Sequence, residues 1–454
     1  MKALAEFLVD IGYHVSGSDG DPDPAAVQSL SRLGVHVRKG HSSSHLQPRP
    51  NLLIYSAAVP ADNPEREAAR QLRIPQYSYI ESLASLTHSR DAVAIAGTHG
   101  KSTTTAMLGQ ILKTAGTECS LLCGAESKAS RRSGWAGTGE VLVVEACEFR
   151  RHFWDLHPRI GCILGVEPDH FDCYPSLADT ERAYHEFARR VLKSEQSFAG
   201  VPPTESKTGT LILSKDCPAV RRVAEGLSGQ IRTFSLHDPE ADWRAVPDIR
   251  SSGQIHFHIE HQGTISESIF MQVPGLHNVR NALAAAACAG ELGMSLPQIV
   301  AGLQQFEGLT RRFEVRGEWR GAVVVDDYAH HPTEIRATLE AARLVYPKRK
   351  IICLFQPHQL SRTSVLLTEF AAALSQADKA YLLPVYAARE QAGKEQVRLV
   401  EELVKRMTIP ARLISALDQV WGTVQTDADK DAVFLTLGAG NLSRIHYDEF
   451  ERVE

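Results

Sequence analysis

The sequence has no long apolar run. No uninterrupted hydrophobic stretch approaches the roughly 18 residues that a membrane-spanning helix requires. The start, MKALAEFLVDIGYH, places Glu6 and Asp10 where a secretory signal would be apolar. We therefore expect a cytoplasmic protein without a membrane partner.

A strong charge of either sign is also lacking. The 49 basic and 54 acidic residues give a formal net charge of -5, and they are interspersed without a long run of like charge. Proteins that bind nucleic acid by its backbone usually carry a basic stripe or patch. We expect no nucleic-acid partner, so local groups must meet any anionic ligand.

Cysteine is sparse, with eight residues and no CxxC pair. This usage in a long chain is typical of reduced thiols in the cytosol. We therefore expect no disulfides.

The chain alternates apolar strand-like runs with helical stretches. Its 454 residues favour about three domains, and the alternation predicts parallel strands with helical crossovers in a doubly wound α/β fold. We place the domains at 1–90, 91–312 and 313–454. A Pro- and Gly-containing segment at 197–209 predicts a surface loop. The expected strands are 52–56, 92–97, 141–146, 161–166, 322–327, 350–355, 379–386 and 432–438; the expected helices include 24–34, 179–193 and 281–293.

The first residues predict an amphipathic helix with no strand before it. Its apolar face comprises Ala3, Leu4, Phe7, Leu8 and Ile11, at helical spacing. A doubly wound domain ordinarily begins with a strand. We therefore expect that part of the natural chain precedes Met1.

A glycine-rich turn follows the strand at 92–97 and opens a helix. Gly97 and Gly100 let backbone N–H groups approach phosphate oxygens, Lys101 neutralises charge, and Ser102 can hold Mg²⁺. The early glycine lies at 97 rather than 95, so the spacing departs from the usual phosphate loop. The alternative is a plain strand-to-helix turn, but the placement of GKS favours nucleotide binding.

Glu145 and His170 follow two further strands and should lie at the same edge of the sheet. Ligands of doubly wound sheets bind at that edge, so both side chains are candidates for Mg²⁺. Histidine is an unusual ligand for so hard an ion. A polar loop residue without a metal is an equal alternative for His170.

Two strand ends in the last third of the chain carry further polar groups. Asp327, His330 and His331 follow one strand, and His358 and Arg362 follow the next. Paired histidines often indicate a transition metal, but no third ligand at metal-site spacing is evident. An arginine at such an edge suits a carboxylate, whose two oxygens it can pair.

Seven motifs run through nearly the whole chain: GTHGKSTTT, VEACEFRRHFWDLHP, VEPDHFDCY, PGLHNVRNALAA, RRFE, DDYAHHPTE and FQPHQLSRT. They occur in the order in which the Mur ligases carry them, and the sequence resembles that family. The resemblance implies a three-domain architecture with a Rossmann-like N-terminal domain lacking its first strand, a central P-loop ATPase-like domain and a Rossmann-like C-terminal domain. It also implies a first strand and a Gly-rich loop upstream of Met1, which the intact mass of the native protein tests. The versions present resemble the branch that uses ATP and Mg²⁺ to join L-alanine to UDP-N-acetylmuramate through an acyl phosphate, as a monomer or homodimer.

The resemblance also implies residue roles. The catalytic residues would be Lys101 and His330, although the proton acceptor is not identified by the motifs. Gln359 departs from the second arginine of many members, which leaves Arg362 as the main carboxylate partner. ATP would contact Gly97, Thr98, His99, Gly100, Lys101, Ser102, Thr103, His277, Asn278, Asn281, Arg312 and Asp327; magnesium would contact Ser102, Glu145 and His170; the amino acid would contact Tyr328, His330, His358 and Arg362; the UDP substrate would contact Ser18, Asp19 and Ser56.

Two alternatives stay open. One is another ligase of the same family, either a peptide-recycling muramate ligase or a folylpolyglutamate synthase. The other is a nucleotide-binding module or plain NTPase without ligation. The residues of the amino-acid pocket would distinguish the first alternative from an alanine ligase. The effect of UDP-N-acetylmuramate plus alanine on phosphate release would distinguish the second.

Overall fold

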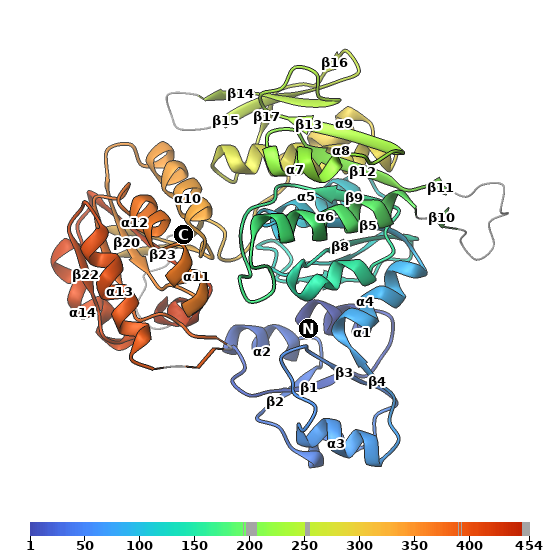
Figure 1. The fold of residues 1–454 in the computed structure, drawn as a ribbon, viewed down its shortest axis with the longest axis horizontal. Helices are drawn as coiled ribbons and strands as arrows, with labels where there is room; N and C mark the ends of the chain where they lie inside the picture. Colours follow the sequence, from blue (N-terminus) through green and yellow to red (C-terminus); the bar gives the residue numbers. More distant parts are fainter. Residues whose placement is uncertain (194, 197–206, 250–254, 389, 392, 447–454) are drawn as a thin grey trace.

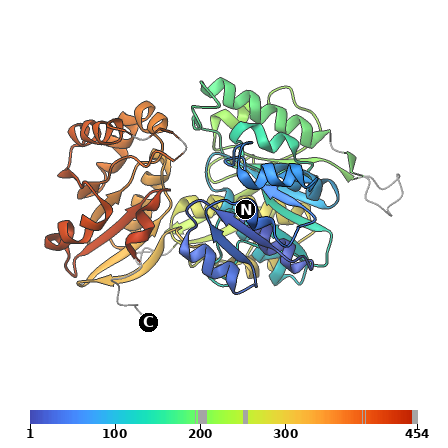
Figure 2. The same cartoon turned by 90° about the horizontal axis from the view of Figure 1, so that it is seen from below.

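The computed structural model shows three α/β units (Figure 1). The C-terminal unit lies beside the central unit, and the N-terminal unit packs below both in this view. Figure 2 shows the C-terminal unit as a separate body beside the other two. The structure describes residues 1–193, 195–196, 207–249, 255–388, 390–391 and 393–446. Most of the loop predicted at 197–209 therefore lies outside the described residues.

The N-terminal unit begins with the predicted helix. Ala3, Leu4 and Phe7 are buried as expected, whereas Ile11 is 43% exposed. The helix ends at Asp10, so Ile11 lies beyond the last turn and does not share the buried face. Strands pair in parallel as predicted, but β1–β2 and β3–β4 form two separate sheets. The elements are α1 Lys2–Asp10, β1 Ser16–Asp19, α2 Pro24–Ser31, β2 His36–Lys39, β3 Leu53–Tyr55, α3 Pro64–Gln71, β4 Gln76–Ser78 and α4 Tyr79–His88.

The central unit is built on an 11-stranded sheet. Its middle strands β12, β9, β5, β8 and β6 pair in parallel, as predicted, and β5 is buried along its whole length. The elements are β5 Asp91–Ala96, α5 Lys101–Thr114, β6 Cys119–Leu122, β7 Gly134–Trp135, β8 Val141–Glu145, β9 Ile160–Ile163, α6 Leu177–Leu192, β12 Thr210–Ser214, α7 Pro218–Ala224, β13 Gln230–Ser235, β14 Trp243–Ile249, β15 Ile255–His261, β16 Thr264–Ile265, β17 Ile269–Phe270, α8 Leu276–Glu291 and α9 Leu296–Gln304. A short two-stranded sheet pairs β10 Glu195–Gln196 with β11 Lys207–Thr208.

Antiparallel strands extend one side of this sheet, which the sequence reading missed. β15 pairs with β14, β16 and β17 in antiparallel fashion. Buried and less buried positions alternate along β15, the period-2 signal of a strand with one covered face. That alternation was available in the sequence and could have revealed the strand.

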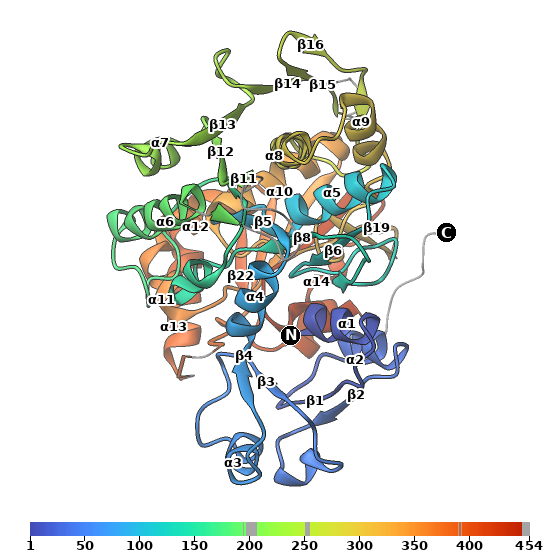
Figure 3. The same ribbon diagram turned by 90° about the vertical axis from the view of Figure 1, so that its right-hand side faces the viewer.

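The alanine-rich helix α8 packs against α5 (Figure 3). All four alanines at 284–287 are fully buried. Small side chains let the two helices approach closely, which places the start of α8 beside the start of α5. The prediction of a tightly packed helix here is confirmed, although α8 begins at Leu276, five residues before the predicted 281.

The C-terminal unit has a six-stranded sheet in the order β18-β19-β23-β20-β21-β22. All its neighbouring strands are parallel except β18 and β19. The edge strand β18 was not predicted. The elements are β18 Glu314–Trp319, β19 Ala322–Asp327, α10 Pro332–Val345, β20 Lys350–Phe355, α11 Leu360–Val365, α12 Leu367–Leu374, β21 Lys379–Leu382, α13 Glu395–Arg406, β22 Ala411–Leu413, α14 Val420–Val424 and β23 Ala432–Leu437.

Among the described helices, none is long and apolar enough to span a bilayer. The predicted three-unit α/β architecture is confirmed.

Candidate active site

The phosphate loop has the shape that its glycines predict. β5 ends at Ala96, α5 begins at Lys101, and Gly97 and Gly100 have positive φ angles of 140° and 82°. A Cβ on Gly100 would lie 2.4 Å from the Asn281 side-chain oxygen. Only glycine fits this turn, both for its backbone angle and for the close approach of α8.

The side chain of Lys101, at the end of this loop, is fixed against the loop backbone. Its Nζ donates to the Gly97 carbonyl at 2.5 Å and to the Glu148 carboxylate at 2.9 and 3.1 Å. Burial disfavours the ammonium, but Glu148 outweighs burial and raises the pKa of Lys101 above its usual value. Lys101 is therefore charged. Sequence reasoning missed Glu148, although it lies in the quoted EACEF motif.

Glu145 and Ser102 both contact the segment that directly follows β6. The Cys123 thiol donates to the Ser102 carbonyl at 3.4 Å, and the next backbone N–H, of Gly124, donates to the Glu145 carboxylate. Ser102 and Thr103 are buried in the first turn of α5. The structure thus brings Ser102 and the Glu145 carboxylate to neighbouring positions near the start of α5.

His170 joins this group from the loop after β9. Its Nε2 lies 3.6 Å from a Glu148 carboxylate oxygen, and its backbone adopts a left-handed φ of 50°. The Nδ1 atom is buried and has no hydrogen-bond partner among the described residues. His170 beside Glu148, and Glu145 and Ser102 near the start of α5, offer the types of donor atom that a divalent cation takes, although no hydrogen bond or ion pair joins His170 to Glu145 in the described part of the chain.

The residues predicted beside the nucleotide gather at the start of α8. The Asn281 side-chain amide donates to the Asn278 side chain at 3.2 Å, which keeps both next to the phosphate loop. Burial, reinforced by Arg280 and Arg312, lowers the pKa of His277 to about 4. His277 is therefore neutral.

Asp327 secures the turn between the central and C-terminal units. Its carboxylate accepts backbone N–H groups of Phe313 and Ala329, both at 2.8 Å. Burial raises the pKa of this carboxyl to about 6. The Arg312 guanidinium lies 5.0 Å from the centre of the Tyr328 ring, so the predicted pair stands at this turn.

The four residues predicted for the amino acid lie together. The His330 ring is centred 5.2 Å from Tyr328 and 6.0 Å from His358, and Arg362 Nη1 donates to the His358 carbonyl at 3.2 Å. Burial lowers the pKa of His330 to about 4, so its imidazole is neutral. Its Nδ1 lies 3.0 Å from the Tyr328 carbonyl, which can only accept, so Nδ1 carries the proton.

Arg362 also makes an ion pair with the central unit. Its side chain is 2% exposed, and Nε donates to Asp169 at 2.8 Å. Burial disfavours the Asp169 carboxylate, but Arg362 outweighs it and holds the pKa well below its usual range. Sequence reasoning missed this partner, which lies 193 residues away and belongs to another unit.

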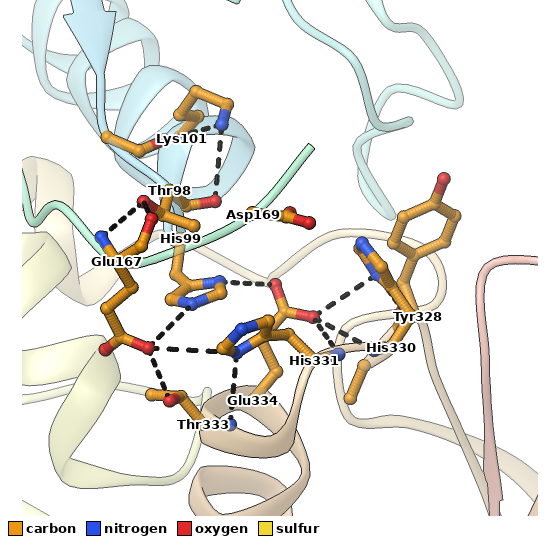
Figure 4. A network of polar contacts seen from close by, with 12 residues as sticks. Thr98, His99, Lys101, Glu167, Asp169, Tyr328, His330, His331, Thr333 and Glu334 are labelled. Carbon is orange, nitrogen blue, oxygen red and sulfur yellow. Dashed lines mark hydrogen bonds and ion pairs between the residues drawn. The ribbon is translucent and has the colours of Figure 1, made fainter. Parts of the chain in front are cut away.

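A second group of contacts crosses the same interface (Figure 4). His99 Nδ1 lies 3.0 Å from Glu334, and its Nε2 lies 3.5 Å from Glu167. Burial disfavours the imidazolium, but the two carboxylates outweigh it and raise the pKa of His99 to about 9. Thr333 donates to Glu167 at 2.6 Å, and His331 caps α10 within the group. Of these residues, His99 was predicted to contact ATP and His331 was predicted only as one of the paired histidines; no role was predicted for Glu167, Thr333 or Glu334.

The residues predicted for the UDP substrate lie on both small N-terminal sheets. Ser18, in β1, donates to Glu65 at 2.7 Å and lies 3.1 Å from His41. Asp19, also in β1, accepts the backbone N–H of the residue two places on at 2.9 Å. Ser56 follows β3 and caps a turn by accepting from the Ala58 N–H at 3.3 Å.

Three family profiles match consecutive stretches of the chain. The profile described as "Mur ligase family, catalytic domain" matches residues 1–90, "Mur ligase middle domain" matches 95–289, and "Mur ligase, glutamate ligase domain" matches 311–440.

Relatives of known activity and known structure extend this similarity. The UDP-N-acetylmuramate–L-alanine ligase of Alkaliphilus metalliredigens is 35% identical, covering 97% of this chain and 93% of the relative. That of Caldicellulosiruptor bescii is 36% identical, covering 98% and 94%. Among solved structures, the UDP-N-acetylmuramate–alanine ligase from Thermotoga maritima superposes with a TM-score of 0.79 at 26% identity, covering 98% and 94%; a murein peptide ligase from Psychrobacter arcticus superposes at 0.73 and 25% identity, covering 98% and 95%.

The order of units, the phosphate loop and the facing histidine loop therefore occur in a chain that is similar to these ligases along nearly its whole length. From these observations, the chain belongs to the Mur ligase family.

Proposed function

We propose that this protein joins L-alanine to the carboxylate of UDP-N-acetylmuramate, with hydrolysis of ATP to ADP and phosphate. One observation carries the proposal: the phosphate loop with Lys101 faces the His330 and Arg362 loops across one interface, in a chain of which relatives named for this activity match 97–98%. In an amide ligase, the site that activates the carboxylate must meet the site that holds the amine. Here the central unit would supply the first site and the C-terminal unit the second.

ATP would lie along the phosphate loop, residues 97–103, with His277, Asn278, Asn281, Arg312 and Asp327 beside it. Backbone N–H groups at the start of α5 and the charged Lys101 favour a polyanion there. Lys101 is now paired with Glu148, so phosphate oxygens must share or replace that partner.

Ser102, Glu145 and His170 would hold Mg²⁺, with Glu148 adjacent. The carboxylates support this assignment, as does the buried Nδ1 of His170, which has no hydrogen-bond partner in the part of the chain that the structure describes. Bound Mg²⁺ would neutralise charge on the phosphates and orient the transferred group.

The first step would convert the muramate carboxylate to an acyl phosphate. An amine attacks a free carboxylate poorly because the leaving oxygen is too basic, whereas phosphate leaves readily. Two anions must approach each other in this step. Lys101 would lower that barrier, since it is held charged at the end of the loop and needs no reorganisation.

In the second step the uncharged amine of alanine would attack the carbonyl carbon of the acyl phosphate, forming the amide bond as inorganic phosphate leaves. His330 is neutral with its proton on Nδ1, so its Nε2 has a lone pair that can accept a proton from the amine. Arg362 would pair the carboxylate of alanine through its terminal nitrogens while Nε stays bonded to Asp169. Tyr328 and His358 would line the same pocket.

The N-terminal unit would hold the UDP moiety through Ser18, Asp19 and Ser56. On this proposal the functional domains are 1–90 for the UDP substrate, 91–312 for ATP and 313–454 for the amino acid. Joining reactants held by different units requires the units to approach each other, so closure would precede chemistry.

An amino-acid panel tests the proposal. Phosphate release is measured with ATP and Mg²⁺, alone and with UDP-N-acetylmuramate plus each amino acid or muramyl peptide. Release that requires UDP-N-acetylmuramate and is fastest with L-alanine supports the proposal. Phosphate release at the same rate with and without both substrates would indicate a plain NTPase. Faster release with a peptide, or with a folate plus glutamate, would indicate another ligase of the family.

A further inference from the structure

His331 acquires metal-ligand neighbours only in the folded chain. Its sequence neighbour His330 belongs with Tyr328 and His358, but the His331 ring lies 4.7 Å from the ring of His99. One nitrogen of His99, one Glu167 carboxylate oxygen and one nitrogen of His331 all lie within 4.8 Å of one another. The paired histidines therefore do not act together, and the central unit instead supplies two further ligands for His331.

We propose that His99, Glu167 and His331 form a binding site for a divalent transition-metal ion, best suited to Zn²⁺, that ties the phosphate loop to the start of α10. Two imidazoles and one carboxylate are a recurring ligand set for zinc, usually with a fourth position left to water or a substrate. The site differs from the proposed Mg²⁺ site in residues and in ligand chemistry.

The distances are close to those that zinc needs. Bonds of about 2.0–2.2 Å in a tetrahedron place neighbouring ligand atoms about 3.4 Å apart. Glu167 Oε2 lies 3.5 Å from His99 Nε2 and 3.8 Å from His331 Nδ1. The third distance, between the two histidine nitrogens, is no more than 4.8 Å. Binding therefore requires these two nitrogens to approach to about 3.4 Å.

The hydrogen bonds around His99 orient its ligand nitrogen. Nδ1 is 3.0 Å from the Glu334 carboxylate, so Nδ1–H donates and Nε2 faces Glu167. Nε2 is buried and makes no hydrogen bond of good geometry to a described residue. A carboxylate behind a histidine is the usual support of a zinc-bound imidazole. Zn²⁺ would take the place of the Nε2 proton.

His331 already exposes a lone pair to the group. Its Nε2 lies 3.3 Å from the Pro168 carbonyl, which only accepts, so Nε2 carries the proton and Nδ1 does not. Nδ1 accepts one long bond, 3.3 Å, from the Thr333 N–H at the start of α10. A metal bond would replace this weak cap, and the Thr333 hydroxyl, 2.6 Å from Glu167, stands beside the site.

The site joins two units, which gives the ion a structural consequence. His99 lies in the phosphate loop and Glu167 in the loop after β9, whereas His331 begins α10 of the C-terminal unit. A metal bound to all three holds the units in the arrangement seen here. The inference does not depend on the ligase reaction, because it concerns metal binding by the free chain.

The test is Zn²⁺ binding by the full chain, stripped with a chelator and titrated calorimetrically in excess Mg²⁺ and without nucleotide. We expect one strong site. His331→Asn should weaken it at least about a hundredfold while keeping α10 capped, because asparagine is a good cap. Glu167→Gln should have a similar effect, and Glu334→Gln should weaken binding about tenfold through the supporting bond.

Matched controls separate this site from adventitious binding. His157→Asn alters a different histidine pair, whose rings are 5.2 Å apart, and should leave affinity unchanged. Cys147→Ser removes the exposed thiol, and Glu145→Gln alters the proposed Mg²⁺ site; neither should matter. Wild-type affinity in His331→Asn and Glu167→Gln, or loss of binding in Glu145→Gln or Cys147→Ser, would overturn the proposal.

A second readout addresses the tie between units. Zn²⁺ should slow hydrogen exchange at the phosphate loop and at the start of α10 in the wild-type chain, and should not do so in His331→Asn. Tight binding without slower exchange in both segments would contradict the bridging arrangement.

Discussion

The phosphate loop and the loops that face it from the C-terminal unit are built in different ways. The loop at 97–102 is shaped by its own glycines, by the start of α5 and by a bond from Lys101 to a carbonyl of the same loop. The facing loops depend on the other unit, because Arg362 is paired with Asp169 across the interface. The backbone of one half of the site is therefore shaped locally, whereas the key side chain of the other half is held by domain contact.

The locally organised half should be the more sensitive to loss of one charge. Lys101→Ala removes the only described ammonium bonded to the loop carbonyl and should reduce ligation about a thousandfold, as loss of a preorganised charge at a transition state does. Phosphate release measures the effect. Lys113→Ala, exposed in the last turn of α5, is the matched control and should retain activity. Ligation at the wild-type rate in Lys101→Ala would remove the loop from the mechanism.

The contact between the two halves should depend on pH through His99. Its pKa is raised from 6.5 to about 9 by Glu334 and Glu167 against burial. A folded-state pKa above the unfolded one adds stability that is fully present below about pH 6.5 and is lost as the pH rises through about 9, here roughly 2–4 kcal/mol. Urea unfolding in the presence of a chelator measures this difference.

Two variants sharpen the pH experiment. In His99→Asn the loss of stability between neutral and alkaline pH should disappear, whereas His36→Asn, exposed in β2, should behave as the wild type. If His99→Asn lost the same amount of stability at alkaline pH as the wild type, that loss would come from the titration of other groups.

A substitution in the loops that are held by domain contact should weaken binding of the amino acid and leave ATP binding intact. Arg362→Ala should raise the KM for alanine about 10- to 100-fold, the usual value of a charged hydrogen bond, with the KM for ATP nearly unchanged. Arg343→Ala, 40% exposed in an ion pair with Asp378, is the control and should change neither constant. Weakened ATP binding alone would contradict the amino-acid role.

The smallest effect should come from one hydrogen bond across the interface. Thr333→Val removes the donor to Glu167 and should lower the free energy of unfolding by about 1 kcal/mol. Thr264→Val, exposed in β16, should have less effect. Equal destabilisation by the two variants would show that the Glu167 contact contributes nothing specific.

Much of the fold was readable because its signals are local. Buried parallel strands such as β5 and β23 are continuous apolar runs, and Gly97 and Gly100 mark the turn before α5. Glu148 shows the limit of this reading. It was visible in a quoted motif, but its bond to Lys101 spans 47 residues and depends on how β8 lies beside β5.

The sequence alone determined the α/β class, the phosphate loop, the order of the motifs and hence the family, because each is a short-range pattern of apolar spacing and backbone permissiveness. Tertiary structure alone decided that Arg362 meets Asp169 and that His331 turns to His99 and Glu167 rather than to His330. The physical reason is that charges and ligand nitrogens act over a few ångströms of space. The number of residues between two positions in the sequence does not predict the distance between their side chains in the folded protein.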